Sequence, residues 1–172
     1  SKIIADCKET LKDYDALEQS IFYDMFGDPV KNDKGWEVKK LGEVCDVKGG
    51  YAFKSENFKN IGIPVLRIGN INSGYFTQNN MVFWNEDDTL EKYAIYPGEM
   101  VMSLTGTVGK DDYGNLCILG SDYKKYYLNQ RNAKLQLHND LDKWMLFFLL
   151  KNKEIKGILT GVSRGVRQAN IA

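Results

Sequence analysis

Residues suited to catalysis and metal binding are scarce in this 172-residue sequence. It has one histidine, His138, and three cysteines, an odd number whose spacing fits neither a disulfide framework nor a zinc site. His138 stands between a predicted strand and a predicted helix with no obvious nucleophile or metal-binding partner, so we expect it to be structural or exposed. No G-x-G-x-x-G loop is present. We therefore predict no catalytic residue, no metal and no cofactor.

The sequence also lacks a long apolar run and a net charge. Its longest apolar run, residues 144–150, is far below the roughly 20 residues of a membrane span, and the charged N-terminus does not resemble a signal peptide. We therefore expect a cytoplasmic protein. The 23 basic residues balance the 23 acidic ones, which taken alone argues against nucleic-acid binding. Residues 141–172, however, carry six basic and two acidic residues, so a neutral total can hide a basic surface.

The stretch VMSLTGTVGK (residues 101–110) suggests a phosphate-binding loop but lacks the required spacing. A Walker-type loop is G-x-x-x-x-G-K-[ST], whereas Leu104 stands at the first glycine position and Asp111, which would repel phosphate, follows the lysine. We therefore exclude a nucleotide site here. The remaining groups are hydroxyls and one cation of the kind that contacts DNA backbones, namely Ser103, Thr105, Thr107 and Lys110. The alternative is a tight turn with solvated threonines.

The first 26 residues are predicted to form one helix. An apolar stripe recurs at nearly the spacing of a coiled-coil seam, and its residues are Leu11, Tyr14, Leu17, Ile21 and Met25. Gly27 and Pro29 end the helix. A helix of this length spans about 39 Å, too long to be covered by one small domain, so we expect the stripe to face a partner helix. The alternative is that the helix packs along its own domain.

The rest of the chain is expected to be mostly β structure. After a linker over residues 27–35, we predict a domain over residues 36–160 with strands at 43–47, 63–69, 75–80, 99–104, 116–119 and 132–137. A second helix is predicted to begin with Asn139 or Asp140 as its N-cap and to bury one face, formed by Leu141, Trp144, Met145, Phe148 and Leu149. Residues 161–172 are expected to form a truncated C-terminal loop or the start of a next element. The fold class is thus α+β.

Several stretches, in this order, resemble the specificity subunits of type I restriction–modification systems. They are LEQSIFYDMFGDP, GWEVKKLGEVC, the G-x-x-F-x-S pattern from Gly50 to Ser55, IPVLRIGNI, YPGEMVMSLTGTVGK, YLNQRNAKLQL and SRGVRQANI. The resemblance implies a target-recognition domain behind one spacer helix. Such subunits carry two of these domains, each of which reads one half of a bipartite DNA site, and have no chemistry of their own; this chain departs from that pattern by having only one. It further implies double-stranded DNA, methyltransferase subunits and a translocase/nuclease subunit as partners, with self-pairing through helices as a possible arrangement.

The expected DNA-contacting residues lie on five segments. In addition to the four from residues 101–110, they are Lys48, Tyr51, Lys54, Ser55, Asn70, Asn72, Asn129, Gln130, Arg131, Arg164, Arg167 and Gln168. Asparagine and glutamine can pair with adenine, and arginine with guanine. The alternative for Asn70 and Asn72 is that they only stabilise a turn. The alternative for residues 164–168 is an ordinary surface loop. Arg67, in mid-strand, is interpreted as a salt-bridged structural arginine.

Two other functions are weighed against DNA recognition. The first is a protein-interaction scaffold that dimerises through its N-terminal helix and does not bind DNA, which the zero net charge favours. The second is a small nucleotide-dependent enzyme, which rests only on the incomplete Gly-Lys loop.

Overall fold

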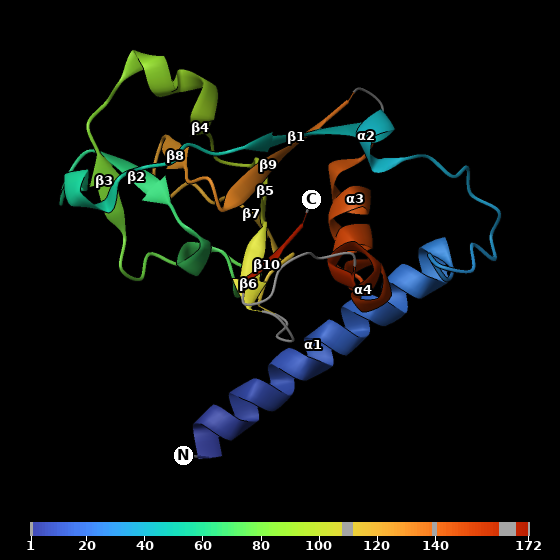
Figure 1. The fold of residues 1–172 in the computed structure, drawn as a ribbon. Helices are drawn as coiled ribbons and strands as arrows, with labels where there is room; N and C mark the ends of the chain where they lie inside the picture. The colour runs from blue at the N-terminus through green and yellow to red at the C-terminus, as the bar shows by residue number, and fades with distance from the viewer. Residues whose placement is uncertain (1, 108–111, 139–140, 162–167, 172) are drawn as a thin grey trace.

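A long helix, α1 (Lys2–Phe26), runs along one side of a strand-rich body (Figure 1). The computed structural model describes residues 2–107, 112–138, 141–161 and 168–171. The helix ends as predicted, because Gly27 takes a left-handed conformation with φ of 77° and its N–H donates to the Tyr23 carbonyl at 2.9 Å. The Trp36 indole N–H also donates to the Phe26 carbonyl at 2.8 Å, which caps the last turn.

The first of two four-stranded sheets is antiparallel throughout. Its strand order is β1-β9-β5-β7, formed by β1 (Cys45–Gly49), β9 (Asn132–Leu137), β5 (Met100–Ser103) and β7 (Leu116–Ile118). All four residues of β5 are buried, since this central strand is covered on both faces. The register places Cys45 opposite Leu137 and Met100 opposite Ile118.

The second sheet contains one parallel pair. Its order is β3-β2-β8-β4, formed by β3 (Val82–Trp84), β2 (Ile63–Leu66), β8 (Tyr126–Leu128) and β4 (Ala94–Ile95). Strands β2 and β8 run parallel, with Val65 opposite Tyr127. A separate antiparallel pair is formed by β6 (Thr105–Thr107) and β10 (Gln168–Asn170). Short helical turns complete the body: α2 (Leu41–Val44), η1 (Ser55–Asn57), η2 (Ile68–Asn70) and η3 (Asp88–Tyr93).

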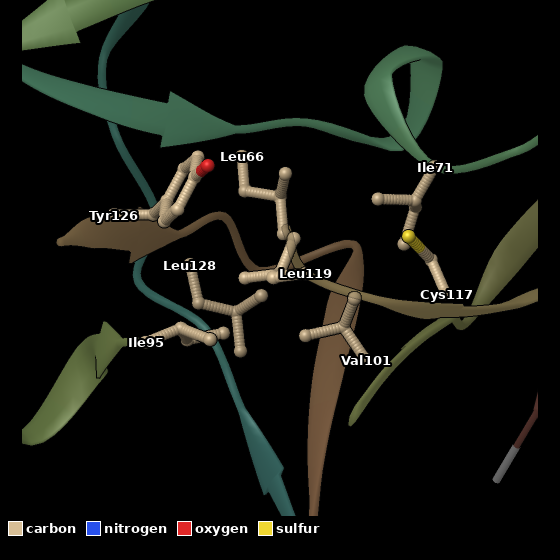
Figure 2. Packing of buried hydrophobic residues seen from close by; sticks show 8 residues of the cluster. All are labelled: Leu66, Ile71, Ile95, Val101, Cys117, Leu119, Tyr126 and Leu128. Carbon is tan, nitrogen blue, oxygen red and sulfur yellow. The ribbon is translucent and has the colours of Figure 1, made fainter. Parts of the chain in front are cut away.

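The two four-stranded sheets share an apolar core (Figure 2). Its fully buried members come from both sheets and their connections, and they are Leu66, Ile71, Ile95, Val101, Cys117, Leu119, Tyr126 and Leu128. The Tyr126 hydroxyl remains satisfied, because it accepts from the Tyr123 N–H at 3.2 Å and donates to the Gly120 carbonyl at 3.4 Å. Burial raises the pKa of the Cys117 thiol to about 12, so this thiol is part of the packing.

Two consecutive helices follow the sheets, where one was predicted. They are α3 (Lys143–Lys151) and α4 (Lys153–Gly161), separated at Asn152, whose side-chain oxygen accepts from the Glu154 N–H at 3.0 Å and so caps α4. The N-cap of α3 is Asp142, which accepts from the Met145 N–H at 2.8 Å. The predicted caps Asn139 and Asp140 lie outside the described residues.

The expected buried face of α3 is wrong. The fully buried side chains are Leu146 and Leu150, which pack under the first sheet, whereas Trp144 is 51% exposed. Three residues of the predicted face, Trp144, Met145 and Phe148, instead line a groove that α3 shares with α1. A helix with apolar residues around most of its circumference has no single face that the sequence can identify.

The strands at 99–104, 116–119 and 132–137 are confirmed, and those at 43–47 and 63–69 are confirmed in part, because the structure has strands at Cys45–Gly49 and Ile63–Leu66. The strand predicted at 75–80 is wrong, since none of these residues belongs to a strand, and residues 43–44 belong to α2. Strand β2 ends at Leu66, and η2 follows. The α+β class is confirmed by the long helix, the sheets and the C-terminal helices. Among the described helices, none is long and apolar enough to cross a membrane.

Candidate nucleic-acid interface

A polar groove of about 500 Å³ lies where β2 and β8 end. Three segments that are distant in sequence form its walls: η1 with the residues after it, the turn after β2 with residues 79–80, and the turn after β8. Its lining residues are Phe53, Ser55, Phe58, Arg67, Ile68, Gly69, Asn70, Asn79, Asn80, Asn129, Gln130 and Arg131. None of these described lining residues is acidic, and two are arginines. The groove is therefore a surface that favours an anionic ligand.

Asn70 supports the floor of the groove from below. Its side chain is 1% exposed, and its Oδ1 accepts from the Arg67 N–H at 3.0 Å. Its Nδ2 donates to the carbonyls of Thr77 at 3.0 Å and Asn79 at 3.1 Å. Because the amide is used within the chain, the burial of Asn70 argues against our expectation that it pairs with adenine, and favours the alternative of turn chemistry.

Arg67 is a groove residue that the sequence interpretation missed. The predicted salt bridge is wrong, since no described acidic residue pairs with it; instead its Nη2 donates to the Asn80 carbonyl. The guanidinium carbon lies over the Phe58 ring, 5.8 Å from the centroid. Its Nε is buried without a hydrogen-bond partner among the described residues. The sequence offered one signal for this role, an arginine among the apolar residues of a predicted strand. That signal does not distinguish a structural salt bridge from a binding site.

The turn after β8 holds its backbone rigidly and exposes its side chains. The N–H of Asn129 donates to the Leu66 carbonyl at 3.1 Å, and the N–H of Gln130 donates to the Tyr51 carbonyl at 3.0 Å. The Asn129 side-chain oxygen accepts from the Arg131 N–H at 3.3 Å. The side chains of Gln130 and Arg131 are exposed at the rim of the groove. These two side chains thus stand on a fixed base and point to solvent, as a base-reading pair requires.

The entry loop between β1 and η1 lies beside this turn. Tyr51 is 38% exposed, forms a bridge with Asn129, and has its ring 4.9 Å from that of Phe53. Lys54 and Ser55 are exposed at the start of η1, and Ser55 also lines the groove. Ser55 therefore meets the residues of the β8 turn, as DNA contact from both segments requires.

Lys48 lies farther back, on β1. Its ammonium donates to the Gln136 side-chain oxygen at 2.6 Å, and the lysine is exposed. It is not among the residues that line the groove. Lys48 is therefore a surface cation that lies apart from the groove lined by Ser55 and Gln130.

The expected site around residues 103–110 divides into buried and exposed parts. Ser103 is fully buried, and its hydroxyl accepts from the Asn115 N–H at 3.0 Å. Asn72 is partly buried and its Oδ1 accepts from the Asn115 amide at 3.1 Å, so both residues hold a connection between turns. Their positions argue against the expected DNA contacts. Thr105 is partly exposed on β6, and the Thr107 hydroxyl donates to Asp112 at 2.8 Å.

Lys110, Arg164 and Arg167 lie outside the described residues. Gln168 belongs to β10, where it pairs with Thr107 of β6. The expected residues Thr105 and Thr107 of β6 and Gln168 of β10 therefore lie on two paired strands. They do not join the groove that Gln130 and Arg131 border.

The apolar stripe of α1 is open to solvent. Its five residues are between 50% and 65% exposed: Leu11, Tyr14, Leu17, Ile21 and Met25. The last four, together with Trp144, Met145 and Phe148 of α3, line an apolar groove of about 540 Å³. Lys151 of α3 pairs with Glu18 of α1 at 2.7 Å and ties the two helices together. The stripe therefore borders the groove between α1 and α3, and its side chains remain at least half exposed.

His138 has a structural environment. Its Nδ1 lies 3.0 Å from the Glu43 carbonyl and its Nε2 lies 3.0 Å from the Asp46 carboxylate. A protonated ring donates to both groups, and the Asp46 hydrogen bond, followed by that of Glu43, raises the pKa of His138. In the part of the chain that the structure describes, no group of three histidine, cysteine, aspartate or glutamate residues could hold a metal ion.

A strand-rich body beside a long helix is a fold that this chain shares with solved chains of type I restriction systems. HsdS of Thermoanaerobacter tengcongensis matches 95% of this chain and 40% of its own length, with a TM-score of 0.54 and 16% identity. A chain from a structure of type I R-M system assembly matches 90% of this chain and 37% of its own, with a TM-score of 0.58 and 18% identity. These likenesses establish the fold.

The chain belongs to the family described as the type I restriction modification DNA specificity domain, whose model matches residues 33–172. It is 32% identical over 142 residues to the type I restriction enzyme MjaVIII specificity subunit of Methanocaldococcus jannaschii, covering 79% of this chain. It is 35% identical over 142 residues to the EcoAI specificity subunit of Escherichia coli, covering 80% of this chain. The chain spans 32% and 24% of the length of these two relatives. The family resemblance seen in the sequence is confirmed.

Proposed function

We propose that this chain recognises one half of a bipartite DNA site within a type I restriction–modification complex. One observation carries the proposal: an acid-free groove is bordered by Gln130 and Arg131 on a backbone fixed by hydrogen bonds to neighbouring strands. Amides pair with adenine edges and guanidinium groups with guanine edges in the major groove. A rigid base keeps these side chains in register with one base pair.

Other exposed residues would position the duplex without reading it. Lys48, Lys54, Ser55 and Thr105 offer cations and hydroxyls on the same body, and such groups contact phosphates. The neutral total charge does not oppose this role, since an anionic ligand responds to the local surface. Lys110, Arg164 and Arg167 remain predictions from the sequence.

The exposed stripe of α1 supports association with other helices. Its apolar side chains, with those of α3, form a groove of about 540 Å³ that suits an apolar helix face. We propose methyltransferase subunits, or a second spacer-type helix, as the occupants. Modification and cleavage would then be carried out by separate methyltransferase and translocase/nuclease subunits, with recognition supplied by this chain. The cytoplasmic location remains a prediction.

A selection from a random duplex pool tests the proposed function. The chain would be incubated with methyltransferase subunits, and bound duplexes would be amplified and sequenced. We expect enrichment of a short half-site, with affinity that falls linearly in log–log plots against salt because phosphate contacts release counterions. A complex that forms but enriches no sequence and binds DNA independently of salt would contradict the proposal. That outcome would support the scaffold alternative.

A further inference from the structure

Arg67 lines the groove but is less exposed than Gln130 and Arg131, which line it too. It directly follows β2, is partly buried, and its guanidinium is held between the Phe58 ring and the Asn80 carbonyl. Asn80 has a left-handed backbone with φ of 53°, within a turn that Asn70 fastens from below. The guanidinium is therefore pre-positioned by two segments that are distant from each other in sequence, at Phe58 and at Asn80. No described carboxylate neutralises it.

The concave setting decides what part of DNA this guanidinium can meet. Base edges lie at the floor of a major groove about 8.5 Å deep, so they are reached by side chains that project from a protein. A recessed side chain meets only what projects from the duplex, which is its phosphates. Phosphate oxygens also accept paired N–H bonds from guanidinium, and among the described residues the Arg67 guanidinium donates only through Nη2 to the Asn80 carbonyl.

We propose that Arg67 binds a backbone phosphate of the duplex and so sets the depth and register at which Gln130 and Arg131 meet the bases. This assignment rests on the proposed function and adds a positioning residue to it. Gln130 and Arg131 border the same groove as Arg67, so a phosphate held in the groove places neighbouring base pairs opposite the rim. Arg67 contributes affinity that is independent of sequence, and the rim residues contribute sequence preference.

The test compares the variants R67Q and R67K with the wild-type chain, each with its methyltransferase subunits. Fluorescence anisotropy would measure affinity for the selected duplex, for single-base-pair variants of it, and across a salt series. We expect R67Q to weaken binding to all duplexes by the same factor, on the order of 10-fold, and to lower the salt slope by about 1. R67K should keep the slope, because lysine retains the point charge.

The control variant is K31Q, which removes one cation from the linker between α1 and α2, away from β2 and β8 (Figure 1). It should leave the salt slope unchanged. A second measurement remains informative if R67Q does not fold. This measurement uses duplexes in which a single phosphate is replaced by an uncharged methylphosphonate. At one position the replacement should weaken the affinity of the wild-type chain, and it should change the affinity of R67K by a different factor.

Three outcomes would overturn the assignment. R67Q could change preference at a single base pair, which would make Arg67 a base reader. R67Q could leave affinity and slope unchanged, or no single phosphate could matter to the wild-type chain. In each case the wild-type chain still selects a half-site, so the proposed function stands. A wild-type complex without sequence preference or salt dependence would overturn both.

Discussion

Replacing Asn70 by alanine should destabilise the protein by about 2–4 kcal/mol, because the substitution removes three hydrogen bonds that are each worth about 0.5–1.5 kcal/mol net. The Arg67 N–H and the Thr77 carbonyl would lose their side-chain partner in a site where Asn70 is 1% exposed. The variant N70D should be at least as destabilised at neutral pH. One carboxylate oxygen would replace Nδ2, the atom that donates to the carbonyls of Thr77 and Asn79.

Urea unfolding followed by circular dichroism measures this effect, and N79A is the matched control. Asn79 is the exposed neighbour in the same turn, and only its backbone carbonyl is used by Asn70. Its substitution should stay within about 0.5 kcal/mol of the wild-type protein. N70A should also retain the sequence preference of the wild-type chain below its unfolding transition. Equal stability of N70A and N79A, or a base-specific loss in N70A, would refute the structural role of Asn70.

Three further predictions concern other parts of the chain. The hydrogen bond to Asp46 raises the pKa of His138 in the folded protein above the unfolded value of 6.5. The protonated ring therefore stabilises the fold fully below pH 6.5, and this stabilisation disappears as pH rises through the folded pKa. The urea midpoint of H138Q should lack the decrease that the wild-type protein shows over this pH range. In G50A, the new methyl group would overlap the backbone at Leu128, so calorimetry should show a lower Tm and DNA titration a weaker affinity. The variant L17S should weaken helix-mediated association in light scattering without lowering the Tm, since Leu17 is 55% exposed. The respective account would be contradicted by a wild-type pH dependence in H138Q, by an unchanged Tm and affinity in G50A, or by unchanged association in L17S.

The sequence identified the long helix and three central strands because their patterns are local. The stripe of α1 repeats over about four turns, and the helix ends before Gly27, so both its existence and its end are visible. Strands β5, β7 and β9 are apolar segments bounded by turns, and they were predicted near their observed bounds. The family resemblance depended on the order of many short motifs.

The groove could not be predicted because it depends on contacts between distant segments. Strand β8 is three residues long, and its parallel pairing with β2 joins residues far apart in the chain. That pairing places Arg67 beside the turn at Gln130, which no local pattern encodes. Asn70 looks like a base-reading asparagine until the turn at residues 77–80 folds over it and takes up its amide. The sequence could therefore suggest exposed polar residues such as Gln130 and Arg131 as candidates, but it could not show that Asn70 is buried.

The most direct test of base reading by the groove rim is a repeated selection with Q130A and R131A. The account predicts that each variant enriches a site with relaxed preference at one or two base pairs, and that the wild-type site loses about 1–3 kcal/mol of binding free energy for each substitution. The remaining positions should be enriched as before. Q130A should keep the wild-type salt slope, because only R131A removes a charge. Selection of the unchanged wild-type site by both variants would contradict the account.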